Sequence, residues 1–146
     1  MRPGKPSAVA FAIVAVAFLP PMLSAQTASP ALHSTRDGVY TAEQAQLGKA
    51  IYQSRCAMCH GDALEGVGAN SPLAGNAFFD KWADQTVADL FMKTITTMPA
   101  TGPGSLTPEE TARLLSYLLS VNKLKAGKQN LSTNPQILES IRLDKP

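Results

Sequence analysis

The chain has 146 residues, which is enough for one modest domain. Its 13 Lys and Arg and 11 Asp and Glu residues give a formal net charge of +2, and they form no basic patch of the kind that binds nucleic acid. Two of the basic residues, Arg2 and Lys5, lie at the very start. Without them the chain has 11 basic and 11 acidic side chains, so the charge identifies no partner.

Residues 1–25 have the pattern of a secretory signal peptide. Arg2 and Lys5 give a basic start, an apolar run follows over residues 8–19, and small residues end the segment at Ser24 and Ala25. We predict cleavage after Ala25 and therefore a periplasmic protein. The apolar run is too short to span a bilayer comfortably, and a retained membrane anchor is the alternative.

Residues 26–40 are rich in Ser, Thr, Pro and Ala, and this composition predicts a disordered linker. The first helix should begin at Thr41, because Thr-Ala-Glu-Gln is a capping box. Gly48 then falls inside the helix, where a glycine often allows another backbone to approach closely. We predict that the last long helix crosses there.

The next residues, Cys56 to His60, read Cys-Ala-Met-Cys-His. This is the attachment signature of a c-type haem. Residues three and four apart share one face of a helical turn, so Cys56 and Cys59 can form thioethers with two neighbouring vinyl groups while His60 binds the iron. The alternatives are a redox dithiol, a structural disulfide and a zinc site, although zinc would require four ligands and the chain has no third cysteine. His33, in the linker, is interpreted as solvated, with distal haem ligation as the alternative.

A loop rich in Gly and Pro follows the motif over residues 61–75. We expect it to wrap around the cofactor on the side of His60, with a backbone carbonyl near Pro72 accepting a hydrogen bond from the second ring nitrogen of His60. Residues 76–82 are predicted to form a short helix. Its Trp82 has an indole N–H that requires a partner, either a haem propionate or a backbone carbonyl.

A further helix should begin at Thr86 and end near Thr97, where the pair Met98-Pro99 follows. Because a proline disfavours helical geometry in the residue before it, Met98 lies at a transition from helix to loop. We predict Met98 as the second axial iron ligand. Met58 lies within the motif itself, and Met92 lies in mid-helix, where we expect it to fill the core.

The last long helix is predicted from Thr107 to Asn122, because Thr107, Pro108 and Glu110 form a strong start signal. Tyr117 on this helix is expected to face Gly48. Residues 123–146 form a mainly polar tail that should pack on the domain through an apolar clasp of Ile137, Leu138 and Ile141.

These features together resemble a class I c-type cytochrome over residues 41–122. The resemblance rests on Gly48, Tyr52, the haem motif, Met98-Pro99 and the capped helix that contains Tyr117. It implies an all-α domain of three to five helices around one covalently attached haem c, with His60 and Met98 as the axial ligands.

More narrowly, the chain is similar to the haem domain at the C-terminus of quinohaemoprotein alcohol dehydrogenases. This similarity rests on Phe79 and Trp82, Met98-Pro99 and the tail from Ala126 to Arg142. The chain is too short to include the dehydrogenase propeller, so the resemblance implies no dehydrogenase activity of its own.

The leading hypothesis for function is a single-electron carrier, not an enzyme, because His and Met ligation leaves no open position on the iron. The resemblance implies redox partners, such as a quinoprotein dehydrogenase as electron donor and a terminal oxidase or another cytochrome as acceptor. One alternative is a five-coordinate haem enzyme or sensor, peroxidase-like, in which Met98 is not bound. The other is a small thiol-redox or structural module without haem.

Overall fold

The computed structural model describes Met1, Gly4 and residues 33–146 of the chain. The predicted signal peptide and residues 26–32 of the predicted linker therefore lie outside the described residues, apart from those two positions. The elements follow in the order β1 (His33–Ser34), the 3₁₀ helix η1 (Thr35–Asp37), α1 (Ala42–Arg55), α2 (Ala57–His60), α3 (Asn76–Trp82), α4 (Val87–Thr97), α5 (Pro108–Val121), α6 (Pro135–Glu139) and β2 (Ile141–Arg142).

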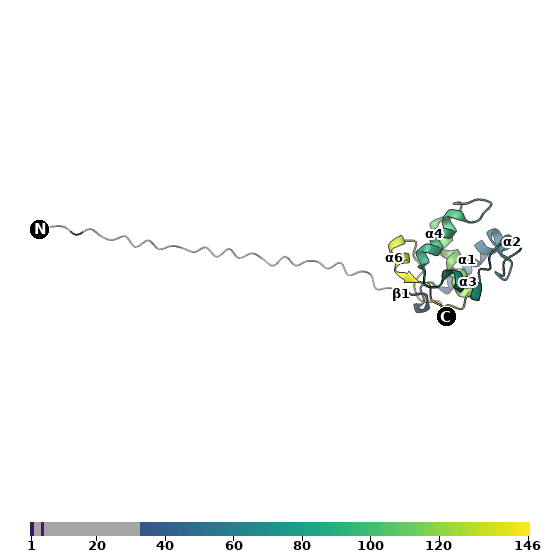
Figure 1. Cartoon of the computed structure of the whole chain (residues 1–146), viewed down its shortest axis with the longest axis horizontal. Coiled ribbons are helices and arrows are strands. Elements are labelled where there is room, and N and C mark those ends of the chain that lie inside the picture. Colours follow the sequence, from purple (N-terminus) through teal and green to yellow (C-terminus); the bar gives the residue numbers. More distant parts are fainter. Residues whose placement is uncertain (2–3, 5–32) are drawn as a thin grey trace.

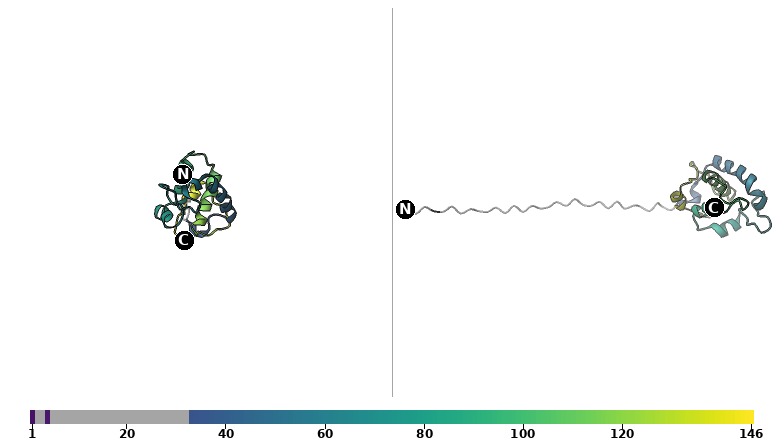
Figure 2. Two further views of the ribbon diagram at one scale, coloured as in Figure 1. Left: turned by 90° about the vertical axis from the view of Figure 1, so that its right-hand side faces the viewer. Right: turned by 90° about the horizontal axis from the view of Figure 1, so that it is seen from above.

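The predicted helical class is confirmed. The described residues contain six α-helices, of which α2 and α6 have only four and five residues, and one parallel pair of two-residue strands (Figure 1; Figure 2). None of the described helices is both long enough and apolar enough to cross a membrane.

Helices α1 and α5 form the central pair of the fold, and they cross at Gly48. A Cβ atom built on Gly48 would lie 1.8 Å from the backbone oxygen of Arg113, so only glycine lets the two backbones come this close. This confirms the predicted crossing. Tyr117, expected to face Gly48, instead packs against Tyr52 with the ring centroids 5.4 Å apart.

Helix α4 begins with a reciprocal cap and ends at the predicted ligand. Thr86 and Asp89 exchange hydrogen bonds at the start of α4, and these bonds from Thr86 lower the pKa of the Asp89 carboxyl. At the other end Met98 has extended backbone dihedrals of −121° and 151°. The helix therefore ends at Thr97, as predicted, and the backbone is extended at Met98, before Pro99.

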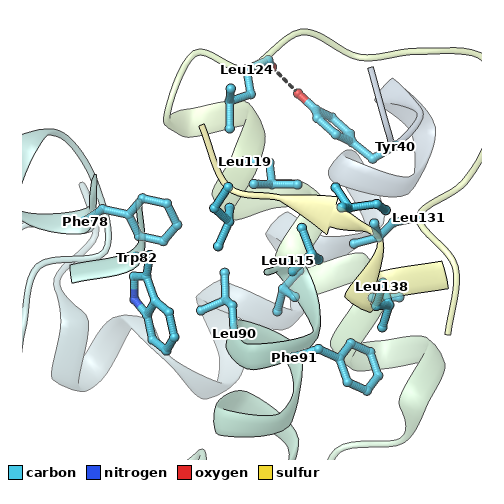
Figure 3. Packing of buried hydrophobic residues seen from close by; sticks show 14 of the residues in the cluster. Tyr40, Phe78, Trp82, Leu90, Phe91, Leu115, Leu119, Leu124, Leu131 and Leu138 are labelled. Atoms are coloured by element: carbon cyan, nitrogen blue, oxygen red, sulfur yellow. Dashed lines mark hydrogen bonds between the residues drawn. The ribbon is translucent and has the colours of Figure 1, made fainter. Parts of the chain in front are cut away.

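Two hydrophobic clusters fill the interior. The larger joins α3, α4 and α5 to both ends of the described chain, and Figure 3 shows Trp82, Phe78 and Leu90 packed beside Leu115 and Leu119. The smaller lies under the haem motif and consists of Tyr52, Leu64, Leu106, Leu114 and Leu118, with half-buried neighbours such as Leu73 and Cys56.

Residues 33–40, predicted as the end of a disordered linker, are folded onto the domain. Tyr40 is 2% exposed, and its hydroxyl donates a hydrogen bond to the carbonyl of Leu124 (Figure 3). Strand β1 pairs with β2, and Gly38 meets Gly127 so closely that a Cβ on Gly127 would lie 1.8 Å from the oxygen of Gly38. The prediction failed because these contacts are made with residues distant in sequence, which composition does not show.

The tail contributes directly to the larger cluster. Leu138 and Ile141 of the predicted clasp are buried, whereas Ile137 is 50% exposed. The tail is also held by the buried side chain of Gln44 on α1: its Nε2 donates to the carbonyl of Leu131 at 3.0 Å, and its Oε1 accepts from the N–H of Leu131 at 2.6 Å. Residues 123–146 are therefore part of the folded domain.

Candidate functional site

The Cys-Ala-Met-Cys-His motif forms a single helical turn, α2, which follows a break in α1. The break lies at Cys56, whose dihedrals are −123° and −36°, and the backbone N–H of His60 then donates to the carbonyl of Cys56 at 2.9 Å. This turn places Cys56, Cys59 and His60 beside the same cavity. Cys56 and Cys59 form no disulfide with each other, which argues against the structural disulfide. Burial raises the pKa of the Cys56 thiol to about 11.

The imidazole of His60 is oriented by the loop that follows the motif. Its Nδ1 lies 2.8 Å from the backbone oxygen of Ser71, the residue before Pro72. A carbonyl can only accept, so Nδ1 is the protonated nitrogen and Nε2 carries the free lone pair. The expected carbonyl near Pro72 is therefore present. The start of this loop is also fixed, because the buried hydroxyl of Tyr52 donates to the carbonyl of Gly61 at 2.6 Å.

A cavity of about 240 Å³ lies between α2, the loop over residues 69–73, helix α4 and the segment after it. Cys56, Cys59, His60 and Met98 all line it. Much of the remaining lining is apolar and comes from Leu73, Trp82, Leu90, Leu114 and Leu118.

This set of donors fits a covalently attached haem. Two thiols can form the thioethers, a neutral imidazole can bind iron on one face, and a thioether sulfur can bind it on the other. The apolar lining suits the faces of a porphyrin. The structure thus brings all four predicted site residues together, from two stretches of the chain that are far apart in sequence.

Two other residues considered as ligands or core lie elsewhere. His33 is exposed and lines a separate cavity of about 760 Å³, next to Leu47 and Arg113, so it does not reach the cavity of the motif. None of the four predicted site residues lines this larger cavity, so it is not the candidate functional site. Met92 is 52% exposed, so the prediction that it fills the core is wrong.

Within the described part of the chain, no group of three or more His, Cys, Asp or Glu side chains is placed to hold a metal ion. The zinc alternative therefore has no support among these residues.

Sequence reasoning missed several residues at the site. Three basic side chains, those of Arg55, Lys81 and Lys93, line the cavity. Asn122, which the sequence suggested only as the end of a helix, binds the loop beside His60. Only the position of Asn122 at the end of an apolar helix face could have signalled it, and that position does not reveal a bonding partner in another part of the chain.

A family model described as "Cytochrome C oxidase, cbb3-type, subunit III" matches residues 43–118, which is just over half of the 146 residues. No curated protein matches the chain.

Among solved structures, a chain in the crystal structure of the sulfane dehydrogenase SoxCD from Paracoccus pantotrophus is similar, with 23% sequence identity and a TM-score of 0.46. The match covers 77% of this chain and 59% of that chain, so it spans less than two thirds of the solved protein.

Proposed function

The chain belongs to the cytochrome c family described as cytochrome C oxidase, cbb3-type, subunit III, and therefore carries covalently attached haem c; from this premise we propose that it is a periplasmic carrier of single electrons. In this proposal Cys56 and Cys59 form the two thioethers, and His60 and Met98 are the axial ligands. The observation that carries the proposal is one cavity lined by all four of these side chains.

When bound, haem c supplies a ferric–ferrous couple that takes up and releases one electron. The residues of the chain hold the site for that exchange. The carbonyl of Ser71 binds Nδ1 of His60 and so leaves Nε2 as the nitrogen that would bind the iron, and the extended backbone at Met98 places this residue outside α4, where its thioether would be the second ligand. If His60 and Met98 both bind the iron, no coordination site would remain for a substrate, which favours electron transfer over catalysis.

The proposed location and partners are supported by the sequence and the family. The pattern of residues 1–25 supports export to the periplasm. The resemblance to quinohaemoprotein dehydrogenase domains supports a quinoprotein dehydrogenase as electron donor. The description of the family, which refers to an oxidase subunit, supports a terminal oxidase or another cytochrome as acceptor.

The test is expression with a system that attaches haem c, followed by absorption spectroscopy of the ferric and ferrous protein. Six-coordinate low-spin haem with a weak sulfur-to-iron charge-transfer band in the ferric form is the expected result. High-spin haem would instead support the five-coordinate enzyme or sensor. The double variant Cys56→Ala/Cys59→Ala should keep no haem in a denaturing gel, and the intact mass of the mature protein should correspond to a start at or near Gln26.

A further inference from the structure

One buried side chain connects the end of α5 to the loop that orients His60. Asn122 is the C-cap residue of α5 and is 3% exposed. Its Nδ2 donates to the carbonyl of Leu73 at 2.9 Å, and its Oδ1 accepts from the N–H of Gly75, also at 2.9 Å. The second proton of Nδ2 goes to the carbonyl of Leu118 within α5 itself, at 2.9 Å.

These bonds use both donors of the amide and one acceptor position, and they define its orientation. A flipped amide would place Nδ2 against the N–H of Gly75 and Oδ1 against two carbonyl oxygens, so only one orientation satisfies all the partners. An asparagine that served only as a helix cap would need no bonds to Leu73 and Gly75. Two of its three bonds therefore serve the loop.

Only Pro72 separates Leu73, which Asn122 binds, from Ser71, which binds the imidazole of His60. Leu73 follows Pro72, whose ring fixes its φ dihedral, and Pro72 follows Ser71, whose carbonyl accepts from Nδ1 of His60 at 2.8 Å. Leu73 is also held from its other side, because its N–H donates to the carbonyl of Leu64 at 2.8 Å. Leu73 is thus held by two hydrogen bonds, one from Asn122 and one to Leu64, and its fixed position restricts where the carbonyl of Ser71 can lie.

We propose that Asn122 is a positioning residue for His60: through Leu73 and Gly75 it holds the carbonyl of Ser71 in place and so sets how strongly the imidazole donates to the iron. A hydrogen bond from Nδ1 to a carbonyl increases the basicity of a metal-bound imidazole. A more basic ligand stabilises the ferric state more than the ferrous one. The bond network that begins at Asn122 therefore lowers the redox potential. This inference rests on the proposed ligation by His60.

The test uses the holoprotein and the variant Asn122→Ala, which removes all three side-chain bonds. Two measurements report on His60 itself: the midpoint potential, and the exchange rate of the Nδ1 proton in the nuclear magnetic resonance spectrum of the ferrous protein. We expect the potential to rise and the proton to exchange roughly tenfold faster, which is the effect of losing about one hydrogen bond's net contribution.

Ser116→Ala is the matched control. Ser116 lies on the same helix, is fully buried, and donates to Gln44 and to the carbonyl of Ala112, away from the haem loop. It should lower the stability of the protein while leaving the potential and the proton exchange unchanged. If Asn122→Ala behaves like this control, Asn122 is only a structural residue and the proposal is wrong.

Asn122→Leu provides the same test if the alanine variant does not retain haem. Leucine has nearly the shape of asparagine and no charge, so it removes the same three bonds without leaving a cavity, and the potential should rise as in the alanine variant. A native potential in this variant would contradict the proposal. The upfield ring-proton signals of an iron-bound histidine in the unmodified protein test the ligation by His60 separately, so a failure of the proposed function is recognised before any variant is compared.

Discussion

At the scale of single residues, the site depends on how the backbone presents each side chain. One helical turn presents two thiols and an imidazole to the same cavity, and an extended residue at the end of α4 presents a thioether to it. The buried face of α4 consists of Val87, Leu90, Phe91 and Thr94. Met92 lies on the same helix but outside this face. The two methionines should therefore respond differently to substitution.

Met98→Ala should abolish the sulfur-to-iron charge-transfer band and allow carbon monoxide to bind the ferrous iron, because it removes the axial thioether. Met98→His should keep six-coordinate haem with a lower potential, since imidazole favours the ferric state more than a thioether does. Absorption spectra and redox titration measure both effects.

Met92→Leu is the control, and it should leave the spectrum unchanged and alter the free energy of unfolding by less than about 0.5 kcal/mol, because Met92 is half exposed. A loss of the band in Met92→Leu but not in Met98→Ala would move the ligand to Met92.

The four residues that line the cavity together could be selected from the sequence because their signals are local. The spacing of Cys56, Cys59 and His60, and the proline after Met98, act within one turn of the chain. The burial of Met92 was predicted wrongly because a position in mid-helix does not show which face of the helix a residue lies on. The polar residue Thr94 lies on the buried face instead. Asn122 could not be assigned a role, because its partners at Leu73 and Gly75 are brought to it only by the tertiary fold.

At the scale of elements, the two crossing helices α1 and α5 both contribute residues to the lining of the cavity. Tyr52 lies in the last turn of α1 and Cys56 is its C-cap residue, while Leu114 and Leu118 come from α5. The crossing could be predicted from one helical glycine in a well-capped helix. The route of the N-terminal segment and the tail could not, because a short strand pair and a five-residue helix carry too little periodicity to be recognised.

Gly48→Ala tests this crossing. In an open helix this change would stabilise by roughly 1 kcal/mol, because alanine has the higher helix propensity. Here the new methyl group would meet the backbone of Arg113, so we expect a loss of about 1–3 kcal/mol in the free energy of unfolding, measured with urea on the holoprotein. Lys49→Ala, an exposed change on the next residue, should stay within about 0.5 kcal/mol. A stabilised Gly48→Ala variant would show that the helices are farther apart.

At the scale of the whole molecule, both ends of the described chain close over one hydrophobic cluster. Tyr40 from the N-terminal side lies in it with Leu124, Leu131, Leu138 and Leu143 from the tail. The tail also joins the link between α3 and α4, because the N–H of Leu143 donates to the carbonyl of Gln85 at 2.8 Å. The region beyond α5 therefore stabilises α4, the helix that precedes Met98.

Leu138→Ala should lower the free energy of unfolding by about 2–5 kcal/mol, because Leu138 is 1% exposed and its removal leaves a cavity. Its neighbour provides the control: Ile137 is 50% exposed, and Ile137→Ala should cost less than about 1 kcal/mol. Urea denaturation of the two holoproteins measures the difference, and the haem spectrum of the folded proteins should be the same in both. Equal losses would mean that the tail does not pack as described.

The place where the described chain begins has a practical consequence for tethering. β1 and η1 lie at the opposite end of the molecule from α2 (Figure 1), and the cavity that β1 borders through His33 is separate from the cavity of the haem motif. An affinity tag, a fused domain or a link to an electrode surface that is joined directly to His33 is therefore attached at the far end from α2. A protein held at β1 in this way keeps the helical turn with Cys59 and His60 away from the support, where a soluble partner can approach it.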